Sequence, residues 1–360
     1  MAIGIRTQER NTMKTVFIFG AGASRDAGAP LMADFLDRAE DLSRSDPELS
    51  REESFKDVFA ALAELQGVHA KSYLDLNNIE VIFGAIEMAQ ILGRLGNRDK
   101  DSIERLRTSI ITLIVKTLEH SVKFKVQNEK ILPPEPYFTF IRMLQDLHFT
   151  DFTFITFNYD LALDYNLNRL RSYDYYLTDS SPRGMPYLKL HGSINWGICA
   201  KCNRIIAHDI SDAYFPALIS EYVHYDLGSR ISFKKHCDTP LMGPPILIPP
   251  TWNKTAHHPD LFNVWRRAAI ELSHAENIFI IGYSMPETDL FFRYLYALGS
   301  ESTKRIRRFW VINTNREVEE RFLRIIGRGI ESRFNFLEMT FESAIGPIKD
   351  ELARAFSLRN

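Results

Sequence analysis

The fold is decided by the stretch Val16-Phe-Ile-Phe-Gly-Ala-Gly-Ala-Ser-Arg-Asp-Ala-Gly-Ala-Pro30. Its apolar first part is typical of a buried strand, and the glycine turn that follows opens a helical pattern. Such a turn lets the backbone approach a pyrophosphate, and the first turn of the helix supplies free N–H groups. The same pattern also describes a tight strand-to-helix turn without a ligand. The residues expected to contact a nucleotide here are Gly20, Ala21, Gly22, Ser24 and Asp26.

The turn departs from the common dinucleotide fingerprint G-x-G-x-x-G. Gly20 and Gly22 fit, but Arg25 stands at the third glycine. The acidic residue expected about 20 positions further on would be Glu40 or Asp41, inside the helix predicted over 24–43. We therefore do not expect an ordinary dehydrogenase.

Bulk composition describes an ordinary globular chain. It has 360 residues, a net charge of −2, 45% hydrophobic residues and three cysteines. A balanced charge argues against general affinity for nucleic acid or membranes. Few cysteines suit a reducing cytoplasm. Residues 1–14 read as a polar N-terminal arm without the apolar core of a signal peptide. No run approaches the roughly 20 apolar residues of a membrane helix.

Strand and helix patterns alternate along the chain. Most predicted strands are apolar on both faces, which is typical of a parallel sheet covered by helices on both sides. The fold class is therefore α/β, a doubly wound Rossmann-like parallel sheet with an inserted helical region and a small irregular, zinc-ribbon-like module. The strands are predicted at 15–20, 152–156, 187–190, 277–281, 309–313 and 334–339.

The domain organisation follows from the same patterns. Residues 50–130 carry apolar positions at helical spacing and no strand candidate, so they form an inserted helical subdomain. The catalytic domain comprises 15–49 and 131–360. Within it, 195–245 forms the small irregular module.

Polar or glycine residues follow several predicted strands. Ligands of an open parallel sheet bind outside the carboxyl ends of its strands, so these segments should meet in one crevice. They are Gly20-Ala21-Gly22, Asn158-Tyr159-Asp160, His191-Gly192, Gly282-Tyr283-Ser284 and Asn313-Thr314-Asn315.

In this order the motifs resemble those of the sirtuins. Gly20 to Ser24, followed by Ala27-Gly28-Ala29-Pro30, is similar to the sirtuin nucleotide loop. Thr156-Phe157-Asn158-Tyr159-Asp160 resembles their T-x-N-x-D segment, and Leu190-His191-Gly192 their L-H-G. The resemblance implies an NAD site, with nucleotide contacts from Thr156, Gly282, Ser284, Asp289 and Asn313.

The Asn-Tyr-Asp and Gly-Tyr-Ser-x-Pro segments are closest to the sirtuin-like domains of bacterial anti-phage systems. That resemblance implies an NAD glycohydrolase, which releases nicotinamide and ADP-ribose and acts by NAD depletion. It also implies a homo-oligomer and activation by a partner, such as a HerA-type ATPase or a short Argonaute. An NAD-dependent protein deacylase and a non-catalytic NAD or ADP-ribose sensor remain alternatives.

The residues expected to carry the chemistry are His191, Asn158 and Asp160. A neutral histidine can accept a proton near pH 7, and an asparagine amide can hold water or ribose. Asp160 would orient a neighbouring group or cap the helix that follows. Ser24, Asp26 and Asp289 have the same cap-or-ligand ambiguity, and His191, Asn158 and Asn313 could also be structural turn residues.

A metal site is expected to be absent or incomplete. Cys199-Ala-Lys-Cys202 has the spacing of half a zinc ribbon, but only Cys237 stands where a second pair is needed. A histidine, His208, His224 or His236, could complete a Cys₃His site. Otherwise the segment is a decayed ribbon held by packing.

Overall fold

The computed structural model describes residues 13–67, 74–168, 172–178, 184–212, 221–249, 258–286, 289–299 and 304–357. Most of the expected N-terminal arm lies outside these residues. No helix within them combines the length and the apolarity that a membrane crossing requires.

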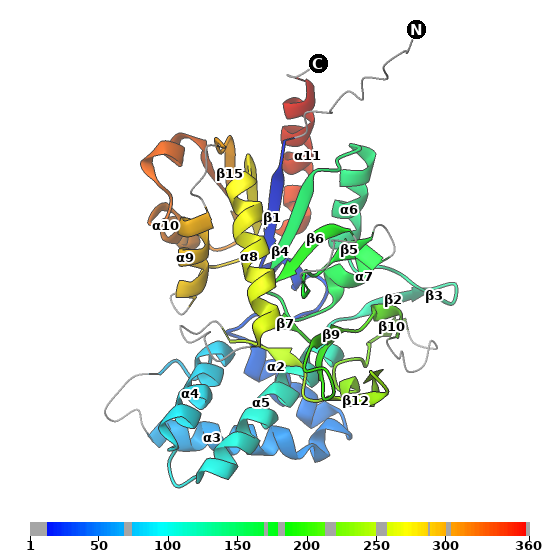
Figure 1. The fold of residues 1–360 in the computed structure, drawn as a ribbon, viewed down its shortest axis with the longest axis vertical. Helices are drawn as coiled ribbons and strands as arrows, with labels where there is room; N and C mark the ends of the chain where they lie inside the picture. The colour runs from blue at the N-terminus through cyan, green and yellow to red at the C-terminus, as the bar shows by residue number, and fades with distance from the viewer. Residues whose placement is uncertain are drawn as a thin grey trace.

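A seven-stranded parallel sheet forms the centre of the molecule (Figure 1). Its order is β16-β15-β14-β1-β4-β6-β5, so the chain moves outward from β1 to one side and returns through β14 to the other. The predicted strands are confirmed, and β5 is an addition. The strands are β1 Thr15–Phe19, β4 Phe152–Thr156, β5 Tyr173–Asp174, β6 Met185–Lys189, β14 Asn277–Ile281, β15 Arg308–Asn313 and β16 Phe334–Glu338.

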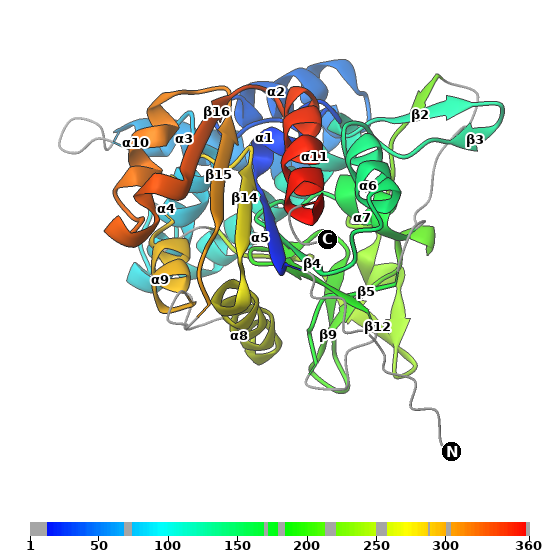
Figure 2. The ribbon, with the colours of Figure 1, turned by 90° about the horizontal axis from the view of Figure 1, so that it is seen from above.

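Helices cover both faces of the sheet, as the doubly wound class requires. Figure 2 shows α6 (Tyr137–Asp146), α7 (Ala162–Asn168) and α11 (Phe341–Ser357) on one face. The other face carries α8 (Pro259–His274), α9 (Leu290–Gly299) and α10 (Glu317–Leu323). Aromatic rings of α6 and α11 pack against the central strand β1. Phe19 lies 5.8 Å from Phe140 and 5.7 Å from Phe341, measured between ring centroids.

A helical layer lies beyond the carboxyl ends of the strands, at the bottom of Figure 1. It consists of α2 Phe35–Ser45, α3 Glu53–Gln66, α4 Ile79–Leu92 and α5 Lys100–Ser121. Asn78 caps α4 by accepting a hydrogen bond from the Glu80 N–H at 2.9 Å. The buried apolar residues of this layer and of the sheet form one hydrophobic cluster. The proposed division into catalytic domain and insertion stays a prediction.

Two local predictions are wrong. The helix predicted over 24–43 is interrupted, because α1 (Ala21–Ser24) is a single turn and α2 begins only at Phe35. Gly28 has a φ of +99°, and a Cβ there would lie 2.4 Å from the Ser121 carbonyl oxygen, so the chain must turn at this position. The segment 50–130 is also not wholly helical. The strand β2 (Phe124–Gln127) pairs with β3 (Lys130–Ile131) across a turn whose residues, Asn128 and Glu129, both have positive φ.

The small module is a four-stranded antiparallel sheet in the order β11-β12-β8-β9. It has a separate core of Cys199, Ile231 and Leu241. A two-stranded ribbon, β7 (Gly192–Ser193) with β13 (Ile246–Leu247), connects the module to the segment after β6, and β10 (Tyr222–Val223) pairs with β2. The strands of the module are β8 Trp196–Cys199, β9 Ile205–Ala207, β11 Lys235–His236 and β12 Thr239–Met242.

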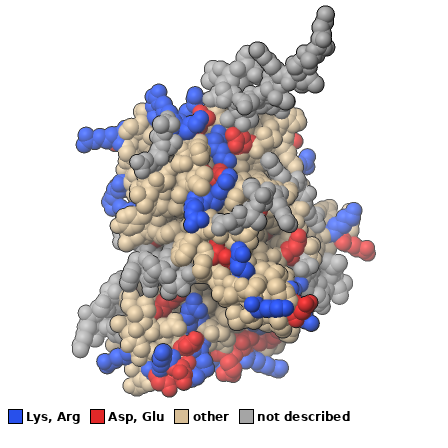
Figure 3. All heavy atoms as spheres, viewed as in Figure 1, with Lys and Arg blue, Asp and Glu red and all other residues tan. Residues whose placement is uncertain are grey.

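Charged side chains are mixed in sign on the face shown in Figure 3. Lysine and arginine alternate with aspartate and glutamate over the helical layer at the bottom of that view. This mixture agrees with the balanced net charge of the chain.

Candidate functional site

A cavity of about 720 Å³ lies between the carboxyl ends of the strands and the helical layer. This volume is within the range of small-molecule and cofactor sites. The sheet side of the lining comes from the turns after β1, β4, β6, β14 and β15, and the helical layer adds residues of α2, α4 and α5. The strand ends therefore converge in one crevice, as the sequence predicted.

The crevice is centred on the switch point of the sheet, where β1 and β14 are neighbours and the chain leaves them in opposite directions. The two turns touch there, and the Gly22 N–H donates to the Gly282 carbonyl oxygen at 2.8 Å. Gly282 has a φ of +65°, and a Cβ on it would lie 2.2 Å from the Ala23 nitrogen. Since α1 is one turn long, it offers little helix dipole, and the cradle consists of closely approaching backbone.

Asn158 belongs to a buried hydrogen-bond network behind this cradle. Its Nδ2 donates to the Gly20 carbonyl oxygen and to the Ser24 Oγ, each at 2.9 Å. The Ser24 Oγ in turn lies 2.9 Å from the Tyr137 hydroxyl. Asn158 is 9% exposed and lines the cavity, whereas Ser24 is fully buried. The network fixes the rotamer of the Asn158 amide relative to the β1 turn.

His191 lies on the other side of Asn158 and is only 2% exposed. Its Nε2 is 3.5 Å from the Asp289 Oδ2. The same carboxylate accepts a hydrogen bond from the Tyr283 hydroxyl at 2.6 Å and caps α9 through the Phe292 N–H. Burial and the neighbouring Asp289 charge raise the pKa of the Tyr283 phenol well above its usual value, so it stays a donor.

Asp160 closes the β4 turn with a second buried cluster. Its carboxylate accepts the Ala162 N–H at 2.9 Å, which forms an Asx turn that leads into α7. Burial is the main cause that raises its pKa. The buried Lys189 ammonium donates to the Asp160 carbonyl oxygen at 2.7 Å and to Asp164 Oδ2 at 3.0 Å. These bonds fix the backbone of the Asn158–Asp160 turn.

No protein-family model matches the sequence, and no curated protein matches it. Among solved structures, a complex of a Sir2 homologue with NAD is 12% identical, with a TM-score of 0.45 over 96% of this chain and 91% of that chain. A mutant Sir2 homologue with ADP-ribose is 14% identical, with a TM-score of 0.43 over 97% and 95% of the two chains. Sir2Tm bound to a propionylated peptide is 11% identical, with a TM-score of 0.38 over 95% and 94%. The chain is similar to sirtuins. The motifs of its sequence resemble those of the same family.

Most of the residues predicted from the sirtuin-like motifs line the cavity. They are Ala21, Gly22, Asp26, Asn158, Asp160, His191, Gly282, Ser284, Asp289 and Asn313.

Gly20, Ser24 and Thr156 are not among the described lining residues. Gly20 packs against Tyr283, since a Cβ there would lie 2.5 Å from the Tyr283 Cα. Ser24 is the last residue of α1 and so does not cap that helix. The Thr156 hydroxyl donates to the Phe19 carbonyl oxygen at 3.2 Å and accepts the Asn158 N–H at 3.1 Å. All three residues stabilise the turns after β1 and β4 and do not line the described cavity.

Sequence reasoning missed several lining residues, notably Arg25, Asn78, Glu80 and Arg321. Nothing in the spacing of residues around Asn78 and Glu80 shows that α4 starts at the cavity. After burial, the Glu80 charge raises the pKa of Tyr159, whose ring centroid lies 6.3 Å from that of His191. At Tyr283 the Glu80 charge also raises the pKa, after burial and Asp289. Glu80 is therefore close to the site in electrostatic terms.

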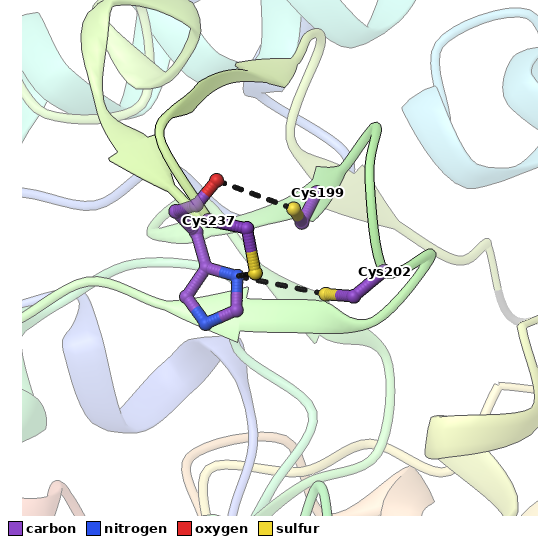
Figure 4. Close-up of side chains that lie close together, drawn as sticks. Cys199, Cys202 and Cys237 are labelled. Atoms are coloured by element: carbon purple, nitrogen blue, oxygen red, sulfur yellow. Dashed lines mark hydrogen bonds between the residues drawn. The ribbon is translucent and has the colours of Figure 1, made fainter.

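The three cysteines meet with His236 in the small module, as Figure 4 shows. Their ligand atoms all lie within 4.8 Å of one another, and the His236 Nδ1 is 3.5 Å from Cys202 Sγ and 3.2 Å from Cys237 Sγ. Hydrogen bonds, above all from the Cys202 backbone N–H, lower the pKa of the Cys199 thiol to about 6. A Cys₃His set with one thiolate fits a structural Zn²⁺.

Of the histidines considered, His236 completes this set. His224 instead stacks on His120, with 4.5 Å between the ring centroids. His208 is not among the residues of the cluster, and its backbone N–H donates to the Asn195 carbonyl oxygen. Zinc would tie β8 to the β11–β12 turn and would stabilise the module without entering the chemistry of the cavity. Trp196 is buried in this module, and Trp252 lies outside the described residues.

Proposed function

We propose that this protein uses NAD and hydrolyses the bond between nicotinamide and ribose, giving nicotinamide and ADP-ribose. The observation that carries the proposal is that Asn158, His191 and the two touching glycine turns lie in one cavity. A pyrophosphate suits the closely approaching backbone of the turns. A histidine beside a carboxylate suits proton transfer near neutral pH.

The roles follow from position. As the C–N bond breaks, the nicotinamide takes the bonding electrons and positive charge develops on the ribose. Water then attacks the anomeric carbon and loses a proton to His191, whose imidazolium is stabilised by Asp289 at 3.5 Å. The Asn158 amide, fixed by Ser24 and Gly20, positions the ribose or the water. The carboxylates of Asp289 and Glu80 favour the positive charge.

We further propose that the reaction serves anti-phage defence by depleting NAD in the cytoplasm. Constant NAD cleavage would harm the host, so the resting enzyme would be inactive or sequestered. Release would come from assembly into a homo-oligomer or from a partner such as a HerA-type ATPase or a short Argonaute. An isolated chain as active as any complex would contradict this regulation.

A deacylase is the second candidate. A protein deacylase of this type needs a well-formed metal module, and the three cysteines alone fall short of one. The arrangement of His236 with them favours this candidate, because it completes a four-ligand set. NAD-dependent removal of an acyl group from a lysine peptide, faster than NAD hydrolysis without peptide, would support deacylation over hydrolysis.

The test is nicotinamide release from NAD by the purified protein, alone and with candidate partners. His191→Ala and Asn158→Ala should each abolish release. His274→Ala is the matched control, because His274 is an exposed histidine at the end of α8 whose ring lies 2.9 Å from the Ile270 carbonyl oxygen of the same helix, and it does not line the described cavity. Release that persists in both cavity variants would overturn the assigned site.

A further inference from the structure

The strand order distinguishes the two ends of the cavity. His191 and Asn158 follow β6 and β4 on one side of β1, whereas Asn313 is the last residue of β15 on the other side. The touching glycine turns lie between them, at the β1–β14 boundary. If the reacting ribose lies at His191, as the proposed function on which this inference rests requires, the pyrophosphate spans the turns. The adenosine then reaches the β15 end.

The β15 end of the cavity differs in charge from the reacting end. Among the residues that the structure describes, the acidic side chains of the lining belong to the α1–α2 loop, to α4 or to the neighbourhood of His191, and they are Asp26, Glu80, Asp160 and Asp289. At the β15 end the described polar lining includes Ser284, Asn313, Thr314, Asn315, Arg321 and Thr340. One cation and five neutral residues are therefore the described polar groups at the proposed place of the second ribose.

This distinction decides which dinucleotide is accepted. A site that selects NAD uses an acidic residue to bind the ribose 2′-hydroxyl, and such a residue repels a 2′-phosphate. A site that accepts the 2′-phosphate has an arginine nearby instead. Here Asn313 is the last residue of the strand, and its Nδ2 donates to the Tyr283 carbonyl oxygen at 3.4 Å.

Arg321, on α10, supplies the cation. It is half-buried, and one of its terminal nitrogens donates to the Ser284 carbonyl oxygen at 3.2 Å, which fixes the side chain over the β14 turn. It forms no ion pair with any residue that the structure describes. A guanidinium has five N–H donors, so most of them remain for a phosphate.

The acidic residue nearest by register is Glu338, which pairs with Asn313 across β15 and β16. Its carboxylate lies 3.5 Å from Arg316, is half exposed, and is not among the described lining residues. Glu338 therefore does not provide the hydroxyl-selecting carboxylate inside the cavity.

We propose that the substrates of this site include NADP as well as NAD, with Arg321 as the residue that binds the 2′-phosphate. The reaction is the same hydrolysis, and NADP yields nicotinamide and 2′-phospho-ADP-ribose. Arg321 is a specificity residue, since it contacts the far end of the substrate and not the reacting atoms.

Calorimetric binding of ADP-ribose and of 2′-phospho-ADP-ribose to the full chain tests this without needing an activator. The wild type should bind the phosphorylated ligand at least as tightly as ADP-ribose. Arg321→Gln should lower the affinity for the phosphorylated ligand about tenfold or more, as expected for loss of a charge-assisted hydrogen bond. It should change the affinity for ADP-ribose less than about threefold. Arg324→Gln, one turn further along at an exposed arginine near Glu320, should change neither.

The outcomes separate this inference from the proposed function. Binding of ADP-ribose with tenfold or greater discrimination against its 2′-phosphate overturns the NADP proposal and leaves NAD hydrolysis standing. An Arg321→Gln variant that binds both ligands like the wild type would show that Arg321 does not bind the 2′-phosphate. If neither ligand binds the wild type, the nucleotide site itself is wrong, and both proposals fail.

Discussion

Gly282→Ala should damage the nucleotide cradle and the fold together. The added Cβ would lie 2.2 Å from the Ala23 nitrogen and 2.5 Å from the Gly22 carbonyl carbon. Ordinary contact begins near 3.4 Å, so the β1 and β14 turns must separate by about 1 Å. That separation breaks the 2.8 Å bond from the Gly22 N–H to the Gly282 carbonyl oxygen. Alanine must also adopt a φ near +65°.

The cost follows from these three effects. The left-handed backbone costs about 1–2 kcal/mol for alanine, the overpacking about 1–3 kcal/mol, and the lost hydrogen bond about 1 kcal/mol. The free energy of unfolding should therefore fall by about 3–6 kcal/mol, a large part of the roughly 5–15 kcal/mol of a typical domain. Urea denaturation measures this loss, and ADP-ribose titration measures the accompanying loss of binding.

Gly327→Ala is the matched control for Gly282→Ala. Gly327 has a φ of −76° and a ψ of 151°, and no atom of the described residues lies within 4 Å of an added Cβ. Alanine suits this backbone, so the control should be unchanged or about 0.4–1 kcal/mol more stable. A Gly282→Ala protein within 1 kcal/mol of the wild type that binds ADP-ribose normally would refute the reasoning about the touching turns.

Three further predictions concern other parts of the molecule. Protein prepared with zinc should contain about one zinc per chain by metal analysis, and His236→Ala should lower both the zinc content and the melting temperature; zinc-free, equally stable wild-type protein would contradict the site. Burial raises the pKa of the Glu119 carboxyl from 4.5 to about 7, so its contribution to stability is complete below pH 4.5 and is lost as the pH rises through 7. The loss of stability is about 3 kcal/mol. Glu119→Gln should remove this part of the pH dependence of the free energy of unfolding, measured by urea denaturation between pH 5 and 8. The same dependence of this free energy on pH in the variant and the wild type would argue against it. Glu80→Gln should lower NAD turnover about tenfold while ADP-ribose affinity stays the same, and unchanged turnover would exclude a role of Glu80 in the transition state.

The sequence alone predicts the sheet and the turns that follow its strands. The apolar runs of β1 and β14 are unambiguous, and parallel strands bring their carboxyl ends to one edge. For that reason the sequence alone places Asn158 and His191 in one crevice. The parallel sheet and the helices on both of its faces were also predicted correctly.

What sequence could not supply depends on long-range packing. The break after α1 arises because Gly28 packs against the Ser121 carbonyl oxygen, far away in the chain. The contact of His191 with Asp289 joins two turns that no spacing rule relates. His236 could not be chosen over His208 and His224 until the fold of the small module placed it among the cysteines.

The most direct measurement of the central claim is a crystal structure of the protein with ADP-ribose. The account predicts the pyrophosphate against Gly22 and Gly282, the terminal ribose within hydrogen-bond distance of Asn158 or His191, and the adenosine beside Asn313. ADP-ribose bound outside this cavity, or bound with its terminal ribose at the β15 end, would contradict the account.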